Sequence, residues 1–217
     1  TLFRSLVKFD QRGDEWAYAL IAADAPGRPA FYGAFGQFTL SDAVMLYGEI
    51  GSSSVSPNLE SSSDPSVPFT TKKNSPRETT GLVGASYTFE DGSSLAGEYL
   101  HDGHGYTSAQ EDAYFARAAT SPANAGLALG LQPRLLGRNY LHVVWQSNVM
   151  DEQGFWRLMY THSLTDHGDE LSAYAETVLT HRITAFVTAA LPHGNARQEF
   201  ASLYRNSVTI GLKFALP

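Results

Sequence analysis

Residues 207–216 decide the fold, because they read SVTIGLKFAL and alternate between large apolar residues and small or polar ones. The large apolar residues are Val208, Ile210, Leu212, Phe214 and Leu216, and those between them are Ser207, Thr209, Gly211, Lys213 and Ala215. Successive side chains of a β-strand point to opposite sides, so this two-residue repeat predicts a strand with one apolar and one polar face. The segment is longer than the usual strand of about five or six residues in globular proteins.

The same alternation recurs along most of the chain. It predicts further strands over residues 2–10, 15–23, 30–40, 43–52, 83–89, 94–99, 141–146, 155–164, 170–179 and 183–191, which makes eleven in all. Helix-period stripes are almost absent, so the chain is predicted to be all-β. An Asp-Gly pair at 91–92 predicts a hairpin. In the strand at 30–40 the two faces stay ambiguous, because Phe31 and Phe35 lie opposite Tyr32 and Phe38.

The connections between these strands differ in length. Those at 11–14, 41–42, 90–93 and 180–182 are short, whereas 53–78 and 101–138 are long and polar or irregular. Short and long connections largely alternate along the chain. Bacterial outer-membrane barrels sort their connections in this way, with tight turns on one rim and long loops on the other. We therefore predict that residues 1–217 form a single antiparallel, up-and-down transmembrane β-barrel.

Composition excludes several other classes of protein. The chain has no cysteine, which rules out disulfides, thiolate metal sites and cysteine nucleophiles. Hydrophobic residues make up 43% of the chain, yet no apolar run approaches the length of a membrane-spanning helix, which needs about 20 such residues. The net charge is -7, and Lys72 and Lys73 form the only basic cluster, so nucleic acid is not an expected partner.

The chain resembles the porin-like outer-membrane proteins of Gram-negative bacteria. The resemblance lies in the alternation, in a last strand carrying Phe214, and in aromatic residues expected near the rims, namely Trp16, Tyr18, Trp145, Trp156 and Tyr160. It implies an outer-membrane location and a lipid bilayer as partner. A closed bacterial barrel has an even number of strands, so eleven strands imply at least one more upstream and twelve or more in the complete protein.

In such a barrel the apolar face contacts lipid and the polar face looks inward. The residues assigned to the lipid face are Leu95, Tyr99, Leu141, Val143, Trp145, Trp156, Leu158, Tyr160, Val208, Ile210, Leu212 and Phe214. The candidates for the pore lining are Glu49, Glu98, His142, Arg157, Glu176 and Lys213. In a wide barrel these would tune ion passage, and in a narrow one they would pair and close it. Because both charge signs are present, we expect no strong selectivity.

The long loop at 101–138 contains two further features. Residues 111–119 are predicted to form a short helix, started by a capping box of Ser108 and Glu111, which either folds into the lumen or packs outside against other loops. The run His101-Asp102-Gly103-His104 is the most metal-like cluster, but its glycine and Gly105 favour a turn at a strand end. No metal or cofactor is therefore predicted. The remaining histidines expected at the rims are His162, His167, His181 and His193.

Three functions remain open. The first is a porin-like channel for small polar solutes or ions. The second is a non-conducting scaffold barrel that anchors or encloses a partner for secretion, electron transfer or surface assembly, with the long loops contacting that partner or another copy of the chain. The third is a soluble sandwich or lipocalin-like binder with its apolar face inward. No Gly-x-Ser-x-Gly elbow is present, and an enzyme is not predicted.

Overall fold

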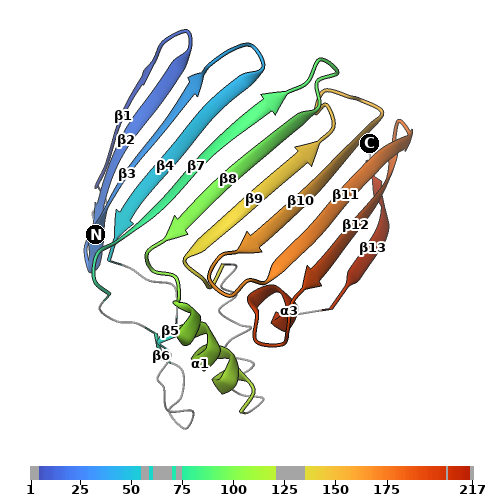
Figure 1. Cartoon of the computed structure of the whole chain (residues 1–217). Coiled ribbons are helices and arrows are strands. Elements are labelled where there is room, and N and C mark those ends of the chain that lie inside the picture. The colour runs from blue at the N-terminus through green and yellow to red at the C-terminus, as the bar shows by residue number, and fades with distance from the viewer. Residues whose placement is uncertain are drawn as a thin grey trace.

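The computed structural model describes residues 5–54, 59–60, 70–71, 75–120, 135–203 and 205–215. Eleven strands form one antiparallel sheet in which each strand pairs with the next along the sheet (Figure 1). They are β1 (Ser5–Arg12), β2 (Trp16–Ala25), β3 (Arg28–Thr39), β4 (Val44–Ser53), β7 (Glu78–Thr88), β8 (Ser94–Asp102), β9 (Asn139–Gln146), β10 (Gly154–Ser163), β11 (Asp169–Thr180), β12 (Ile183–His193) and β13 (Ser207–Phe214). Between β4 and β7, the short strands β5 (Leu59–Glu60) and β6 (Thr70–Thr71) pair with each other.

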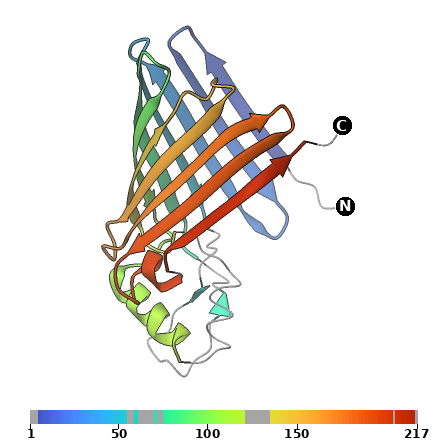
Figure 2. The ribbon, with the colours of Figure 1, turned by 90° about the vertical axis from the view of Figure 1, so that its right-hand side faces the viewer.

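The predicted eleven-stranded, all-β meander is confirmed. Some strand boundaries differ from the predicted ones by a few residues. Strand β7 begins at Glu78 rather than at 83, and β1 extends through Arg12, into the predicted turn. The predicted strand residues 2–4 and 216 lie outside the described residues. The sheet curls, with β1 and β13 at its two edges (Figure 2), and within the described ranges these two strands do not pair with each other.

The two ends of the sheet carry different connections. One end, here called the short-turn rim, has the connections 13–15, 40–43, 89–93, 147–153 and 181–182. The other end, the long-loop rim, has 26–27, 54–77, 103–138, 164–168 and 194–206. Figure 1 shows the helices α1 (Ser108–Ala118) and α3 (Glu199–Leu203), with β5 and β6, gathered at the long-loop rim. The three longest connections therefore emerge at the same end.

Strand register sorts the side chains into two faces. Directly paired residues point to the same side, so the row through Leu95, Trp145 and Leu158 belongs to one face, and Ala173, Ala189 and Val208 continue it. All twelve residues assigned to lipid lie on this face, here called the apolar face. Eleven of them are 39% to 79% exposed, and Trp156 is half-buried.

This exposure excludes one of the three alternatives. A soluble sandwich or lipocalin-like binder would gather the apolar face into a dry interior. Of the residues described in the strands, only Ala19 and Tyr140 are buried apolar side chains. The expectation of an inward apolar face is therefore wrong.

The same register resolves the ambiguous faces of β3. Tyr32 and Phe38 lie on the apolar face, whereas Phe31 and Phe35 lie on the other side. The ring of Phe31 lies against Gly33 and Gly51, where an added Cβ would come within 3.0 and 3.1 Å of it. Because these two positions lack side chains, a large ring fits on the polar side of the sheet.

The buried core lies beyond the sheet, at the long-loop rim. Tyr106, Tyr114, Phe115 and Leu136 pack together, with Tyr114 and Phe115 contributed by α1. Both views show α1 past the ends of the strands (Figures 1 and 2), so of the two expected positions it takes the external one, against neighbouring loops. Neither described helix is long and apolar enough to cross a membrane.

Helix α1 begins earlier than predicted. Its N-cap is Thr107, and the capping box is completed by Gln110, whose Oε1 accepts the Thr107 N–H at 2.9 Å. The predicted box of Ser108 and Glu111 is wrong: Ser108 is already helical and Glu111 is buried. Both pairs have the spacing that a capping box requires, so the sequence pattern does not distinguish them.

Candidate functional site

The polar face of the sheet is the side opposite the apolar face. All six candidates for the pore lining lie on it: Glu49, Glu98, His142, Arg157, Glu176 and Lys213. The structure thus places the acidic and basic candidates on one surface. They fall into three groups, one on β4 and β8, one on β11 and β13, and one on β9 and β10.

A hollow of about 610 Å³ lies on the polar face over β3, β4, β7, β8 and the end of β9. Glu49 and Glu98 line it together with Tyr47, Gln37 and Gln146. The Tyr47 hydroxyl donates to Glu98 Oε1 at 2.6 Å, although β7 lies between their strands. A side chain that bridges over an intervening strand indicates that the polar face is the inside of the curl.

A glycine makes this bridge possible. The Tyr47 ring covers Gly84 of β7, where an added Cβ would lie 2.7 Å from the ring carbon Cζ. A larger residue at position 84 would displace the ring and its hydrogen bond to Glu98. Tyr47 was missed in the sequence because tyrosine fits an apolar or a polar face equally well. Only the register brings it over a glycine.

The second group lies beside the edge strand β13. Lys213 donates through Nζ to the Tyr174 hydroxyl at 2.7 Å and to Glu176 Oε2, reaching across β12. Its ammonium also lies 5.6 Å from the centre of the Phe186 ring. Here the opposite charges neutralise each other.

The remaining two candidates bond to neutral partners. Arg157 Nε donates to Gln146 Oε1 at 2.9 Å, and His142 Nδ1 lies 2.8 Å from Thr161 Oγ1. These contacts join β9 and β10. They fix the position of the two side chains without neutralising the guanidinium.

The long-loop rim contains a buried carboxylate that the sequence did not reveal. Glu199 of α3 is 0% exposed. Its Oε1 accepts the Leu136 N–H at 2.9 Å, and its Oε2 accepts the Tyr140 hydroxyl at 2.5 Å. The Tyr140 oxygen in turn accepts the N–H of Gly137. Glu199 thereby ties α3 to the end of the loop before β9.

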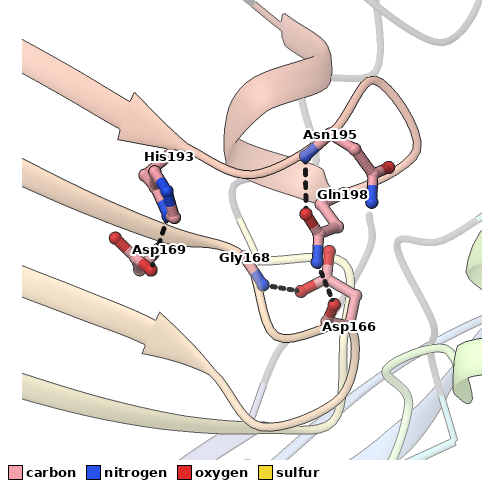
Figure 3. Close-up of polar contacts among 6 residues, drawn as sticks. All are labelled: Asp166, Gly168, Asp169, His193, Asn195 and Gln198. Carbon is pink, nitrogen blue, oxygen red and sulfur yellow. Dashed lines mark hydrogen bonds and ion pairs between the residues drawn. The ribbon is translucent and has the colours of Figure 1, made fainter.

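Asp166 ties two further segments of this rim together (Figure 3). Its Oδ1 accepts the Gly168 N–H at 2.9 Å, and its Oδ2 accepts the Glu199 N–H at 2.6 Å. Gln198 donates through Nε2 to the Asp166 carbonyl oxygen at 2.6 Å and accepts the Asn195 N–H at 2.6 Å. The β10–β11 turn and the β12–β13 connection are therefore joined by hydrogen bonds.

Glu111 of α1 faces this network. It is 1% exposed, and neither carboxyl oxygen has a hydrogen-bond partner among the described residues. Burial, together with the charges of Asp166, Glu199 and Asp112, raises the pKa of Glu111 to about 9. Burial also raises the pKa of Glu199 to about 7, although its hydrogen bonds from Tyr140 and Leu136 oppose that shift. Glu111 therefore keeps its proton at neutral pH and is held as a neutral acid.

The run from His101 to His104 comprises the last two residues of β8 and the turn that follows them. His101 and Asp102 point to opposite faces: His101 Nδ1 lies 2.8 Å from Asn139 Oδ1, and Asp102 Oδ1 accepts the Thr80 hydroxyl at 2.9 Å. Within the described ranges, no three histidine, aspartate or glutamate side chains are arranged to hold a metal ion.

The four histidines expected at the rims lie at strand ends or in turns. His162 and His193 are at the long-loop ends of β10 and β12, and His167 and His181 are in the adjoining turns of the two rims. His193 Nδ1 lies 3.4 Å from Asp169 Oδ2 (Figure 3).

No protein-family model matches the chain, and no curated protein matches it. Among solved structures, "NanC porin structure in rhombohedral crystal form" matches with a TM-score of 0.40 and 11% sequence identity. The match covers 99% of this chain and 94% of that one. Similarity at this level supports no conclusion about what the chain does.

Proposed function

We propose that the chain forms a transmembrane β-barrel of a Gram-negative outer membrane and acts as a porin-like channel for small polar solutes or ions. One observation carries the proposal: the large apolar side chains cover the exposed face of a curled sheet whose inner face is polar. Such a sheet separates a lipid environment from an aqueous one.

The apolar face is too extensive to remain in water. Large apolar side chains are exposed along every long strand, from Val7 and Phe9 of β1 to Ile210 and Phe214 of β13. Covering apolar surface is worth about 25 cal/mol per Å², and soluble monomers rarely expose patches above a few hundred Å². A bilayer core covers such a band on all sides.

Several aromatic residues of the apolar face lie near one end of their strands, whereas Tyr99 and Tyr160, the second of which was expected near a rim, lie three residues from the long-loop ends of theirs. Trp16, Phe38, Tyr87, Trp145 and Trp156 all lie within two residues of the short-turn end of their strands. The rings of Trp145 and Trp156 meet edge to face, with their centroids 5.1 Å apart. Tyrosine and tryptophan favour the boundary between lipid tails and water, so this row supports a membrane interface at the short-turn rim. By this reading that rim is periplasmic and the long-loop rim faces outward.

Closure of the barrel is part of the proposal. In an antiparallel meander of eleven strands, β1 and β13 run in the same direction. They would close the sheet by pairing in parallel or through one further strand antiparallel to both. The second arrangement gives the even number of strands of bacterial barrels.

A non-conducting scaffold is the second candidate. It is favoured by the packed long-loop rim, where α1 forms a core with Tyr106 and Leu136 and a hydrogen bond from Leu136 joins α3 to it. The contacts of Tyr47 with Glu98 and of Lys213 with Glu176 across the polar face also favour it. These contacts would narrow a lumen, and the rim would then present α1 to a partner or to another copy.

Conductance separates the two candidates. The chain would be refolded in detergent, checked for β-structure by circular dichroism, and added to planar bilayers in 1 M KCl. We expect stepwise openings of uniform size, since a water-filled lumen passes ions. Folded, membrane-inserted protein that never opens would exclude the channel and leave the scaffold.

A further inference from the structure

The polar face carries more negative than positive charge. Among the strand residues whose side chains the structure describes, register places seven carboxylates on it: Asp10, Glu49, Glu78, Glu98, Asp102, Glu170 and Glu176. It places four lysine or arginine side chains there: Lys8, Arg12, Arg157 and Lys213. The excess is acidic, and its distribution over the strands is uneven.

Two of the four basic side chains are neutralised near the edges of the sheet. Lys213 pairs with Glu176, and Lys8 Nζ lies 3.6 Å from Asp10 Oδ1. Arg157 lies on β10, with its guanidinium 5.2 Å from the centre of the Phe155 ring. The middle strands β4, β7 and β8 contribute carboxylates to the polar face and no lysine or arginine.

The register pairs no lysine or arginine with the two central carboxylates, Glu49 and Glu98. Glu49 is paired with Phe35 on β3 and Leu82 on β7. Glu98 is paired with Gly84 on β7 and His142 on β9.

The hollow of about 610 Å³ is built from these same strands. Its fourteen lining residues include Glu49 and Glu98 and no lysine, arginine or histidine. Its other polar groups are neutral side chains, among them Tyr47, Gln37 and Gln146. The Tyr47 hydroxyl holds the Glu98 carboxylate in place across β7.

From this arrangement we propose that the channel selects small cations over anions, and that they reside in the hollow between Glu49 and Glu98. The inference rests on the proposed channel function and gives its substrate class. Unneutralised carboxylates on a low-dielectric wall concentrate counter-ions, and acidic side chains are a common basis of cation selectivity. The expectation of no strong selectivity rested on the presence of both charge signs and took no account of their separation, since β4, β7 and β8 carry carboxylates on the polar face and no lysine or arginine.

The test is a reversal-potential measurement in planar bilayers across a tenfold KCl gradient. We expect potassium to be roughly threefold to tenfold more permeant than chloride, at or below the lower end of the counter-ion enrichment that charged clefts produce. The preference should weaken as ionic strength rises from 0.1 to 1 M, because the screening length falls from about 10 to about 3 Å.

Charge-removing variants localise the effect. Glu49→Gln and Glu98→Gln should each lower the potassium to chloride permeability ratio by about half, and the amide oxygen introduced by Glu98→Gln can still accept the Tyr47 hydroxyl. Asp24→Asn is the matched control, because it removes the same charge from an exposed residue on the apolar side. Circular dichroism and the single-channel conductance would verify that each variant folds and inserts.

Each outcome of the bilayer measurements supports or overturns the proposed cation selectivity. Cation preference that falls in both glutamate variants and stays in Asp24→Asn supports the inference. Open channels with chloride preference or none, or a preference unchanged by both glutamate variants, overturn the inference and leave the channel function standing. Folded, inserted protein without openings overturns the channel function and the inference with it.

Discussion

In the sheet the large apolar side chains lie exposed on one face, whereas at the long-loop rim Tyr114 and Phe115 are buried beside two buried ionisable residues, Glu111 and Arg117. The sheet is held by backbone hydrogen bonds between strands, and its apolar face still requires a covering medium. The rim is packed like the interior of a small soluble domain. The stability of the two regions should therefore depend on different changes. That of the sheet should depend on the residues of its apolar face, and that of the rim on core packing and protonation.

The largest expected effect is at the rim. Phe115→Ala removes a ring from the buried cluster and should destabilise α1 by about 3–5 kcal/mol, the usual cost of truncating a core phenylalanine. Hydrogen exchange with mass spectrometry should show lost protection in α1 and unchanged protection in β10–β12. Ala116→Ser, at an exposed position of the same helix, is the control. Equal loss of protection in the strands would show that rim and sheet unfold as one unit.

The next effect concerns the two faces of β10. Leu158→Arg places a charge on the apolar face near the middle of the strand and should cost about 2–4 kcal/mol of folding free energy in lipid vesicles. Met159→Arg places the same charge on the polar face and should cost much less. Urea titrations of both variants in vesicles measure the difference. A larger cost at position 159 would reverse the proposed orientation of the sheet.

The smallest effect is a pH dependence of the rim. The folded pKa of Glu111, about 9, lies above its ordinary value of 4.5, so the folded rim binds this proton more tightly than the unfolded chain does. Stability should therefore fall as pH rises from about 4.5 to about 9 and then level off. Glu111→Gln cannot ionise and should make the rim about 1–3 kcal/mol more stable than wild type at pH 9, with little difference at pH 4.

Hydrogen exchange of the α1 amides, corrected for the pH dependence of intrinsic exchange rates, measures this change in the stability of the rim. Asp112→Asn is the control, because Asp112 is exposed on the same helix and contributes least to the Glu111 shift. The raised pKa of Glu199 adds a smaller dependence that should persist in the Glu111→Gln variant. A variant whose pH profile matches that of wild type would show that Glu111 is not buried as a neutral acid.

Much of the fold could be predicted from the sequence, because the evidence for it is local. Alternation identified all eleven sheet strands and put the six polar candidates and twelve apolar residues on opposite faces, as the register shows. Sequence patterns gave a wrong or ambiguous answer where two neighbouring residues fitted the pattern equally well. Thr107 and Ser108 both suit a capping box, and Phe31 and Tyr32 both suit an apolar face.

The site itself depended on contacts between distant residues. Tyr47 and Glu98 form a hydrogen bond although 51 positions separate them in the sequence. The Leu136 N–H and Glu199 do so across 63 positions. Nothing in the sequence pairs such residues, because their distance follows from strand register and from the curl of the sheet. Burial of Glu111 and Glu199 likewise depends on how α1 and α3 pack at the rim.

The sequence by itself determined that the chain is a meander of two-faced strands, because side-chain alternation is a property of each extended backbone segment. Only the tertiary structure decided which polar groups meet, which glycines leave room for Phe31 and Tyr47, and which carboxylates line a hollow without lysine or arginine. Those outcomes arise when separate segments are brought together, so the acidic hollow and the buried rim became visible only in the folded chain.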